Sequence, residues 1–210
     1  MPFPSKELDH ISSITLEHYN KNAQGFREGT KDHDVSQNIN SLLRHINSKA
    51  PFTILDVGCG PGRDLKTFSA LGHKAIGLDG ALEFVEMARA ETLCEVWHQD
   101  FLKLDLPKEY FDGVFANASL FHIPTQELPR VLKQFHTTLK PGGVLFSSNP
   151  RGANEEGWNI ITARWVCRVN NNPGWRVCGG KYKLHSNLFS FAKDTYPPLY
   201  NILCTIIILY

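Results

Sequence analysis

The chain has 210 residues, of which 42% are hydrophobic and 20% are charged, and its formal net charge is +1. These proportions are ordinary for one soluble globular domain, and they argue against a disordered chain. The near-neutral charge gives no reason to expect nucleic acid or an anionic membrane surface as a partner. The longest strongly apolar run, residues 202–210, is far shorter than the ~20 residues that span a bilayer.

The cysteines and the first residues bear on metal binding and on location. No two of the five cysteines have the spacing of a structural zinc site, so no metal is expected. Their odd number also argues against a disulfide framework. The first ten residues lack the apolar stretch of a signal peptide, which predicts a cytoplasmic location.

From residue 35 onward, helix-like and strand-like segments alternate. An apolar stripe from Val35 to Ile46 predicts an amphipathic helix. Strands are then expected over 53–57, 75–78, 95–98, 111–116 and 144–148. Helices are expected over 61–71, 82–90 and 128–139, and a turn is expected over 140–143.

This alternation predicts an α/β fold. Short connections and nearly continuous apolar strands favour an open, mostly parallel, doubly wound sheet with helices on both faces. In such sheets, ligands bind beyond the carboxyl ends of the strands. The residues that follow each strand are therefore the candidates for a site.

The sequence changes character after about residue 158. Residues 159–210 carry a net charge of +5 against −4 for residues 1–158, and they contain glycine and asparagine clusters. We therefore expect a domain over 1–158 and an atypical basic segment over 159–210 that is weakly ordered. Only residues 201–210 read as a strand, a possible edge strand, so the sheet is expected to lack a normal final β-hairpin.

A glycine-rich loop follows the first strand and opens a helix. Its glycines are Gly58, Gly60 and Gly62, and Asp56 precedes them at the end of the strand. The spacing is G-x-G-x-G, because Arg63 stands where a nicotinamide-binding fingerprint would have its third glycine. The carboxylate of Asp56, at the end of the strand, would repel a pyrophosphate but suits a ligand with an ammonium group. Two alternatives to this interpretation of the loop are a nicotinamide-dependent oxidoreductase and a plain strand-to-helix turn that binds no ligand.

Polar side chains follow the next three strands as well. Asp79 ends the second strand, where a carboxylate can accept hydrogen bonds from both hydroxyls of a ribose. Asp100 and Phe101 follow the third strand and could meet the amino group and the ring face of an adenine. Asn117 and His122 lie in the loop after the fourth strand, where His122 could act as a general base or be an ordinary packing residue.

With these motifs in order, residues 19–150 resemble the class I S-adenosylmethionine-dependent methyltransferases, which have a Rossmann-like fold. The stretches that carry the resemblance are ILDVGCGPGRDLKTFSALGHKAIGLDGALEFVEMARA, FDGVFANASLFHIP and LKPGGVLFSSNP. The resemblance also extends upstream, to a Tyr-x3-Ala-x2-aromatic segment that many such enzymes use as a lid.

The resemblance implies a role for each candidate residue. The three glycines would wrap the methionine part of the cofactor, with Asp56 nearby and Cys59 contributing through its backbone. Asp79 would hold the ribose, Asp100 and Phe101 would frame the adenine, and Asn117 would line the sulfonium side. In a lid segment over residues 10–34, the aromatic side chains would be Tyr19 and Phe26, although both could be ordinary helix-packing residues.

The implied function is methyl transfer from S-adenosyl-L-methionine to a small-molecule acceptor by in-line displacement. His122 is the only candidate catalytic residue and a weak one. No nucleic acid and no membrane partner are expected. The alternative is a catalytically impaired, cofactor-binding isoform whose catalytic domain is truncated. The acceptor and the oligomeric state stay open.

Overall fold

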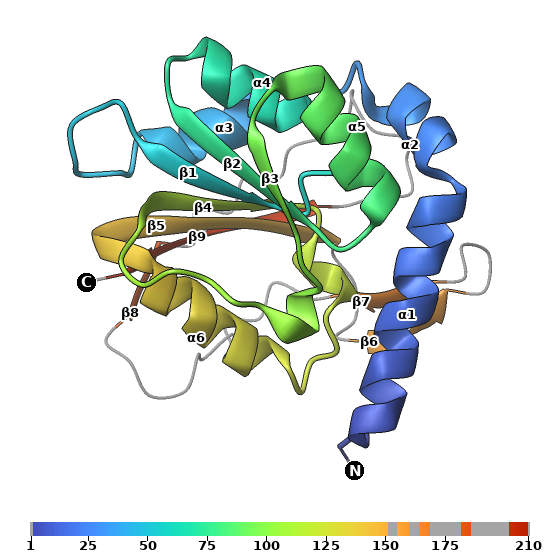
Figure 1. The fold of residues 1–210 in the computed structure, drawn as a ribbon. Helices are drawn as coiled ribbons and strands as arrows, with labels where there is room; N and C mark the ends of the chain where they lie inside the picture. Colours follow the sequence, from blue (N-terminus) through green and yellow to red (C-terminus); the bar gives the residue numbers. More distant parts are fainter. Residues whose placement is uncertain (1, 151–154, 160–163, 169–181, 186–201, 210) are drawn as a thin grey trace.

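A seven-stranded sheet forms the centre of the fold (Figure 1). The computed structural model describes residues 2–150, 155–159, 164–168, 182–185 and 202–209. The strands lie in the order β3 (Glu95–His98), β2 (Lys74–Asp79), β1 (Thr53–Val57), β4 (Phe111–Asn117), β5 (Leu139–Pro150), β9 (Ile202–Leu209) and β8 (Tyr182–His185). Strands β1 to β5 are parallel, whereas β9 is antiparallel to both β5 and β8. The mostly parallel, doubly wound α/β fold is thereby confirmed.

Helices cover both faces of this sheet (Figure 1). One face carries α3 (Ser36–Leu43), α4 (Arg63–Ala70) and α5 (Leu82–Thr92), and the other carries α6 (Leu128–Thr138). The helices α1 (Ser5–Lys21) and α2 (Ala23–Thr30) stand beside the edge where the parallel strands end. Two short 3₁₀ helices follow strands there, η1 (Phe101–Lys103) after β3 and η2 (Leu120–His122) after β4.

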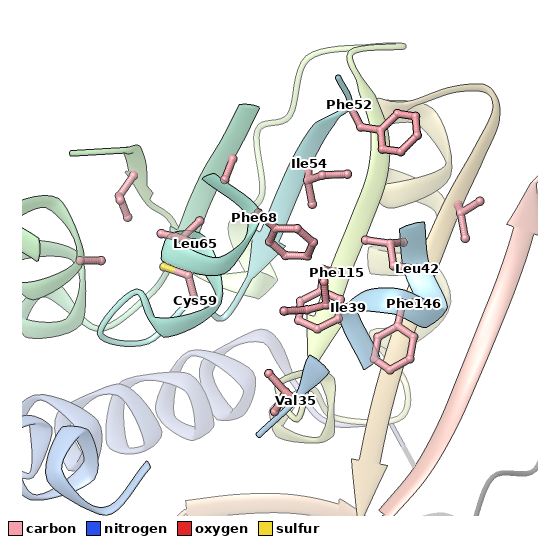
Figure 2. Packing of buried hydrophobic residues seen from close by; sticks show 14 of the residues in the cluster. Val35, Ile39, Leu42, Phe52, Ile54, Cys59, Leu65, Phe68, Phe115 and Phe146 are labelled. Carbon is pink, nitrogen blue, oxygen red and sulfur yellow. The ribbon is translucent and has the colours of Figure 1, made fainter. Parts of the chain in front are cut away.

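The alternation of side chains along the strands builds two apolar cores. Ile54 points to the α3–α5 face, whereas Leu55 points to the α6 face, and both are fully buried. Figure 2 shows the first core, where Phe68 of α4 packs edge-on against Phe115 at 5.3 Å between ring centroids. Phe115 in turn stacks on Phe146 of β5 at 5.1 Å. These cores hold β1, β4 and β5 rigidly, so their carboxyl ends form a fixed platform.

The expectation that the sheet lacks a final antiparallel pair is wrong. Strand β9 pairs with β5 from Val144↔Ile208 to Pro150↔Ile202, and β8 pairs with β9 from Tyr182↔Leu209 to His185↔Ile206. Residues 202–209 are therefore an inner strand rather than an edge strand. The prediction failed for two reasons. The charge break indicated a segment of a different kind, and the short alternating run over residues 182–185 is easily overlooked among turn residues. The expected weakly ordered residues 160–163, 169–181 and 186–200 lie outside the described part of the chain.

A second, two-stranded sheet follows β5 and was not predicted. It consists of β6 (Glu155–Asn159) and β7 (Arg164–Arg168), which pair antiparallel and lie beside α1 and η2 (Figure 1). The Thr125 backbone N–H and hydroxyl both donate to Glu156 Oε2, each at 2.8 Å. This pair of strands therefore borders the same edge of the main sheet as α1.

Candidate active site

The glycine-rich loop leaves β1 in a conformation that favours glycine. Gly58, Gly60 and Gly62 have φ values of +73°, +52° and +91°, in the left-handed region. A Cβ on Gly58 would lie 2.5 Å from the Ser119 Cβ, and one on Gly62 would lie 2.6 Å from the Thr92 Cγ2. At Gly60 only the Phe26 ring is near, at 3.7 Å, so the backbone conformation alone requires glycine there.

Asp79 ties the end of β2 to this loop. Its Oδ2 accepts a hydrogen bond from the Gly60 N–H at 3.0 Å, and its Oδ1 accepts one from the Ala81 N–H at 2.8 Å. Burial raises the pKa of the Asp79 carboxyl to about 6, although the backbone N–H groups that bond to it act in the opposite direction. Each carboxylate oxygen keeps a further lone pair for a donor on a ligand.

Asp56 is a buried acid with an unused oxygen. Its side chain is 2% exposed, and its Oδ2 has no hydrogen-bond partner among the described residues. Burial holds the pKa of this carboxyl well above its ordinary value, and the nearby Asp64 raises it further. An unpartnered buried carboxyl is costly to the folded protein, so a cationic donor arriving from a ligand would stabilise it.

Asp100 and Phe101 border the loop from the end of β3. Asp100 Oδ1 accepts from the Leu102 N–H at 2.8 Å, which begins η1, and its Oδ2 accepts from the Ser12 hydroxyl at 2.7 Å. The Phe101 Cζ lies 3.3 Å from the position that a Cβ of Gly58 would take. The structure thus brings the Phe101 ring against the first glycine, and it connects Asp100 to α1.

Four aromatic rings meet where α1 and α2 contact the edge of the sheet at which the parallel strands end. The Tyr19 hydroxyl lies 2.7 Å from His122 Nε2, and their ring centroids are 5.3 Å apart. Tyr19 also contacts Phe26 at 5.7 Å and Phe84 at 5.6 Å. The structure therefore brings Tyr19, Phe26 and His122 together, and it adds Phe84. Sequence reasoning missed Phe84, although its place just after Asp79 in the first turns of α5 was a usable signal.

Asn117 ends β4 with its carbonyl oxygen already engaged. Oδ1 accepts hydrogen bonds from Asn38 Nδ2 at 2.9 Å and from the Ser148 hydroxyl at 2.7 Å. The amide is thereby fixed between α3 and the end of β5. Its two partners were missed, because only the tertiary structure brings α3 next to the two strand ends.

Cys59 is buried within the loop. Burial raises the pKa of its thiol well above the ordinary value, so the thiol stays protonated. Its backbone N–H donates to the Leu78 carbonyl at 3.2 Å. The residue is thus placed to shape the loop rather than to act as a nucleophile. In the described part of the chain, no cluster of His, Cys, Asp and Glu side chains could hold a metal ion.

The comparisons with known proteins agree with this geometry. A family profile described as "Methyltransferase domain" matches residues 54–143, which span the glycine loop and the ends of β1, β2, β3 and β4. This chain carries a class I S-adenosylmethionine-dependent methyltransferase domain. The recognition made from the motifs is therefore confirmed.

Individual relatives are distant, and most are much longer than this chain. It is 33% identical over 135 residues to a trans-aconitate 2-methyltransferase of Azoarcus sp. (strain BH72). The aligned stretch covers 61% of this chain and 52% of that protein. It is 26% identical over 166 residues to a sterol 24-C-methyltransferase of Clavispora lusitaniae. That aligned stretch covers 66% of this chain and 42% of that protein. The chain thus spans about half the length of each of these relatives.

A solved structure extends the likeness of the fold. It is that of the 1,6-didemethyltoxoflavin-N1-methyltransferase of Burkholderia thailandensis, with its substrate and S-adenosylhomocysteine bound. The TM-score is 0.73 at 16% identity, and the match covers 100% of this chain and 92% of that one. At this identity the likeness establishes the methyltransferase fold and nothing finer.

Within the described residues, no helix combines the length and the apolar character needed to cross a bilayer.

Proposed function

We propose that this methyltransferase domain binds S-adenosyl-L-methionine and transfers its methyl group to a small-molecule acceptor by in-line displacement. The observation that carries the proposal is the Asp79 carboxylate, which bridges the left-handed glycine loop and the start of α5. This arrangement presents an acceptor for hydroxyl groups next to a backbone that a ligand can approach closely.

Buried groups at this edge match the chemical parts of the cofactor. Asp79 offers acceptors for the two ribose hydroxyls. Asp56 offers an unpartnered oxygen to an ammonium group, which would restore the ionised form of the acid. Asp100 and the Phe101 ring offer an acceptor and a flat apolar face to adenine. The residues present thus fit S-adenosylmethionine better than a dinucleotide with its negative pyrophosphate.

The aromatic cluster would complete the reaction site. When bound, the cofactor supplies an electrophilic methyl group on a sulfonium. Tyr19, Phe26 and Phe84 are placed to exclude water next to the glycine loop, and aromatic faces favour a neighbouring cation. His122, hydrogen-bonded to Tyr19, would accept the proton that an oxygen or nitrogen acceptor must lose. An acceptor that arrives already deprotonated would not need this step.

The names of the relatives support methyl transfer without selecting an acceptor, since two name a small molecule and one names a malonyl group carried on a protein. They include a sterol, trans-aconitate and malonyl-[acyl-carrier protein] as acceptors in those proteins.

The alternative function, a catalytically impaired isoform, depends on a truncated sheet, and the β8–β9 pair removes that reason. A cytoplasmic location and the lack of a nucleic-acid partner stay predictions from the sequence.

One calorimetric series tests the proposal. The chain is titrated with S-adenosylmethionine, S-adenosylhomocysteine and NAD under one set of conditions. We expect saturable binding of the first two and none of NAD. Binding of NAD alone, or of none of the three, would overturn the proposal.

A further inference from the structure

A second buried oxygen without a partner lies against the glycine loop. Ser119, in the loop between β4 and η2, is 5% exposed, and its hydroxyl has no hydrogen-bond partner among the described residues. Its Oγ lies 3.3 Å from the position that a Cβ of Gly58 would occupy. Buried hydroxyls are normally bonded, so an unpartnered one at the carboxyl edge of the sheet indicates a ligand group.

The backbone of the loop has few free donors to offer. The N–H groups of Gly58 and Cys59 both donate to the Leu78 carbonyl, at 2.7 Å and 3.2 Å. The Gly60 N–H donates to Asp79, and the Gly62 N–H donates to the Cys59 carbonyl at 3.0 Å. Pro61 has no N–H. The described hydrogen bonds therefore engage the backbone N–H of each of the four residues from 58 to 62 that have one.

Arg63, the cation that follows the loop, is also engaged. Its Nε and Nη2 donate to the two carboxylate oxygens of Asp64, at 2.7 Å and 3.0 Å, and its Nη1 donates to the Thr30 carbonyl. This fork-shaped pair fixes the guanidinium toward Asp64. The Ser119 O–H is left as a side-chain donor next to Gly58.

We propose that Ser119 is a cofactor-binding residue whose hydroxyl donates a hydrogen bond to the carboxylate of the cofactor's amino-acid end. Asp56 accepts from the ammonium of the same end, so an acceptor and a donor together match a zwitterion. This inference rests on the proposed function. It adds a residue and a chemical role that the motifs did not indicate.

The proposal predicts opposite effects on the free protein and on binding. Ser119→Ala removes an unpartnered buried hydroxyl, so the thermal midpoint of the unliganded protein should stay the same or rise. The affinity for S-adenosylhomocysteine should fall about tenfold, because the hydrogen bond would go to a charged group. A purely structural serine would show the reverse, with a lower midpoint and an unchanged affinity.

Matched ligands locate the contact. S-adenosyl-3-thiopropylamine lacks the carboxylate but keeps the amine, and 5′-methylthioadenosine lacks both groups. Ser119→Ala should weaken binding of S-adenosylhomocysteine alone, whereas Asp56→Asn should weaken both ligands that carry an amine. The control is Ser147→Ala, a buried serine of β5 whose hydroxyl already accepts from Asn149 Nδ2 at 2.8 Å. It should change the affinity for S-adenosylhomocysteine less than twofold.

The outcomes separate this inference from the proposed function. If the unaltered chain binds S-adenosylhomocysteine and Ser119→Ala binds it equally well, the inference alone is wrong. An equal loss for all three ligands would also overturn it, because the hydroxyl would then serve the adenosine part or the fold. If the unaltered chain does not bind S-adenosylhomocysteine, both the proposed function and the inference fail.

Discussion

At the scale of single residues, buried carboxyl groups carry most of the chemistry of this site. Asp56 and Asp79 end neighbouring strands, and burial raises the pKa of both. They differ in their partners, since Asp79 accepts two backbone N–H groups while one oxygen of Asp56 has no partner among the described residues. The Asp79 carboxylate is therefore held in one orientation, whereas Asp56 has an oxygen that can accept a hydrogen bond from a ligand.

Replacing the Asp79 carboxylate should weaken cofactor binding without unfolding the chain. Asp79→Asn keeps the size of the side chain but removes the charge and turns an acceptor into a donor, facing either the Gly60 or the Ala81 N–H. We expect the affinity for S-adenosylhomocysteine to fall about tenfold to a hundredfold. Calorimetry measures the affinity, and circular dichroism checks the fold. An unchanged affinity in a folded variant would contradict the assignment of Asp79 to the ribose.

The raised pKa of Asp79 predicts a pH dependence of binding. The pKa of this carboxyl is about 6 in the folded chain against an ordinary 3.8, so folding favours its protonated form. Its contribution to stability is therefore fully present below 3.8 and is lost as the pH rises through 6. Ribose hydroxyls donate to the ionised form, so cofactor binding should weaken as the pH falls below 6 and should release a proton near that pH.

Titrations with S-adenosylhomocysteine between pH 5 and 8 measure this effect, and two buffers of different ionisation enthalpy count the protons released. Asp79→Asn has no carboxyl to titrate and should remove the step near pH 6. A step of equal size in that variant would show that another group causes it.

At the scale of elements, the glycine loop should tolerate no side chain at Gly60. Gly60→Ala forces an L residue to a φ of +52° beside the Phe26 ring, and the loop should move off Asp79. We expect the affinity for S-adenosylhomocysteine to fall at least about tenfold.

Gly72 offers a matched control for this variant. It has a φ of +83° just after α4, and a Cβ there would meet no atom within 4 Å. Gly72→Ala should therefore lower stability through the same backbone strain while leaving the affinity unchanged. Equal losses of affinity in the two variants would mean that the loop matters only for folding.

The elements also separate what the sequence could predict from what it could not. The strands β1 and β3 have the predicted bounds, because each is a short run set off by turn residues. The turn expected over 140–143 falls within β5, which begins at Leu139, and it is an irregularity of that strand: β4 pairs with Leu139 and next with Val144. Gly142 has a φ of +77°, so the proline and glycines interrupt the pairing with β4 as the sequence indicates, and the strand continues on either side of them.

For the site, the motifs predicted which residues gather but not how they bond. Asp56, Asp79 and the glycines follow strand ends, so topology alone brings them together. The contact of Ser119 with Gly58 and the hydrogen bond between Tyr19 and His122 depend on how η2 and α1 pack. No local pattern encodes such contacts, and their roles stay predictions.

At the scale of the whole molecule, β9 joins the last part of the chain to the methyltransferase domain. Ile206 pairs with Phe146 of β5 on one side and with His185 of β8 on the other, so it lies in an inner strand. Ile206→Pro removes a backbone donor from the ladder, and we expect the thermal midpoint to fall by about 4 °C or more. Differential scanning calorimetry measures it. An unchanged midpoint would show that the domain is stable without this pairing.

The central claim is that the carboxyl edge of β1 and β2 binds S-adenosylmethionine through the glycine loop and Asp79. The most direct test follows the backbone amides by nuclear magnetic resonance during a titration with S-adenosylhomocysteine. The claim predicts that the amide signals of Gly58, Gly60, Gly62 and Ala81 shift together and saturate with one dissociation constant, while that of Gly72 stays in place. Saturable shifts confined to other parts of the chain, or no shifts at all, would contradict it.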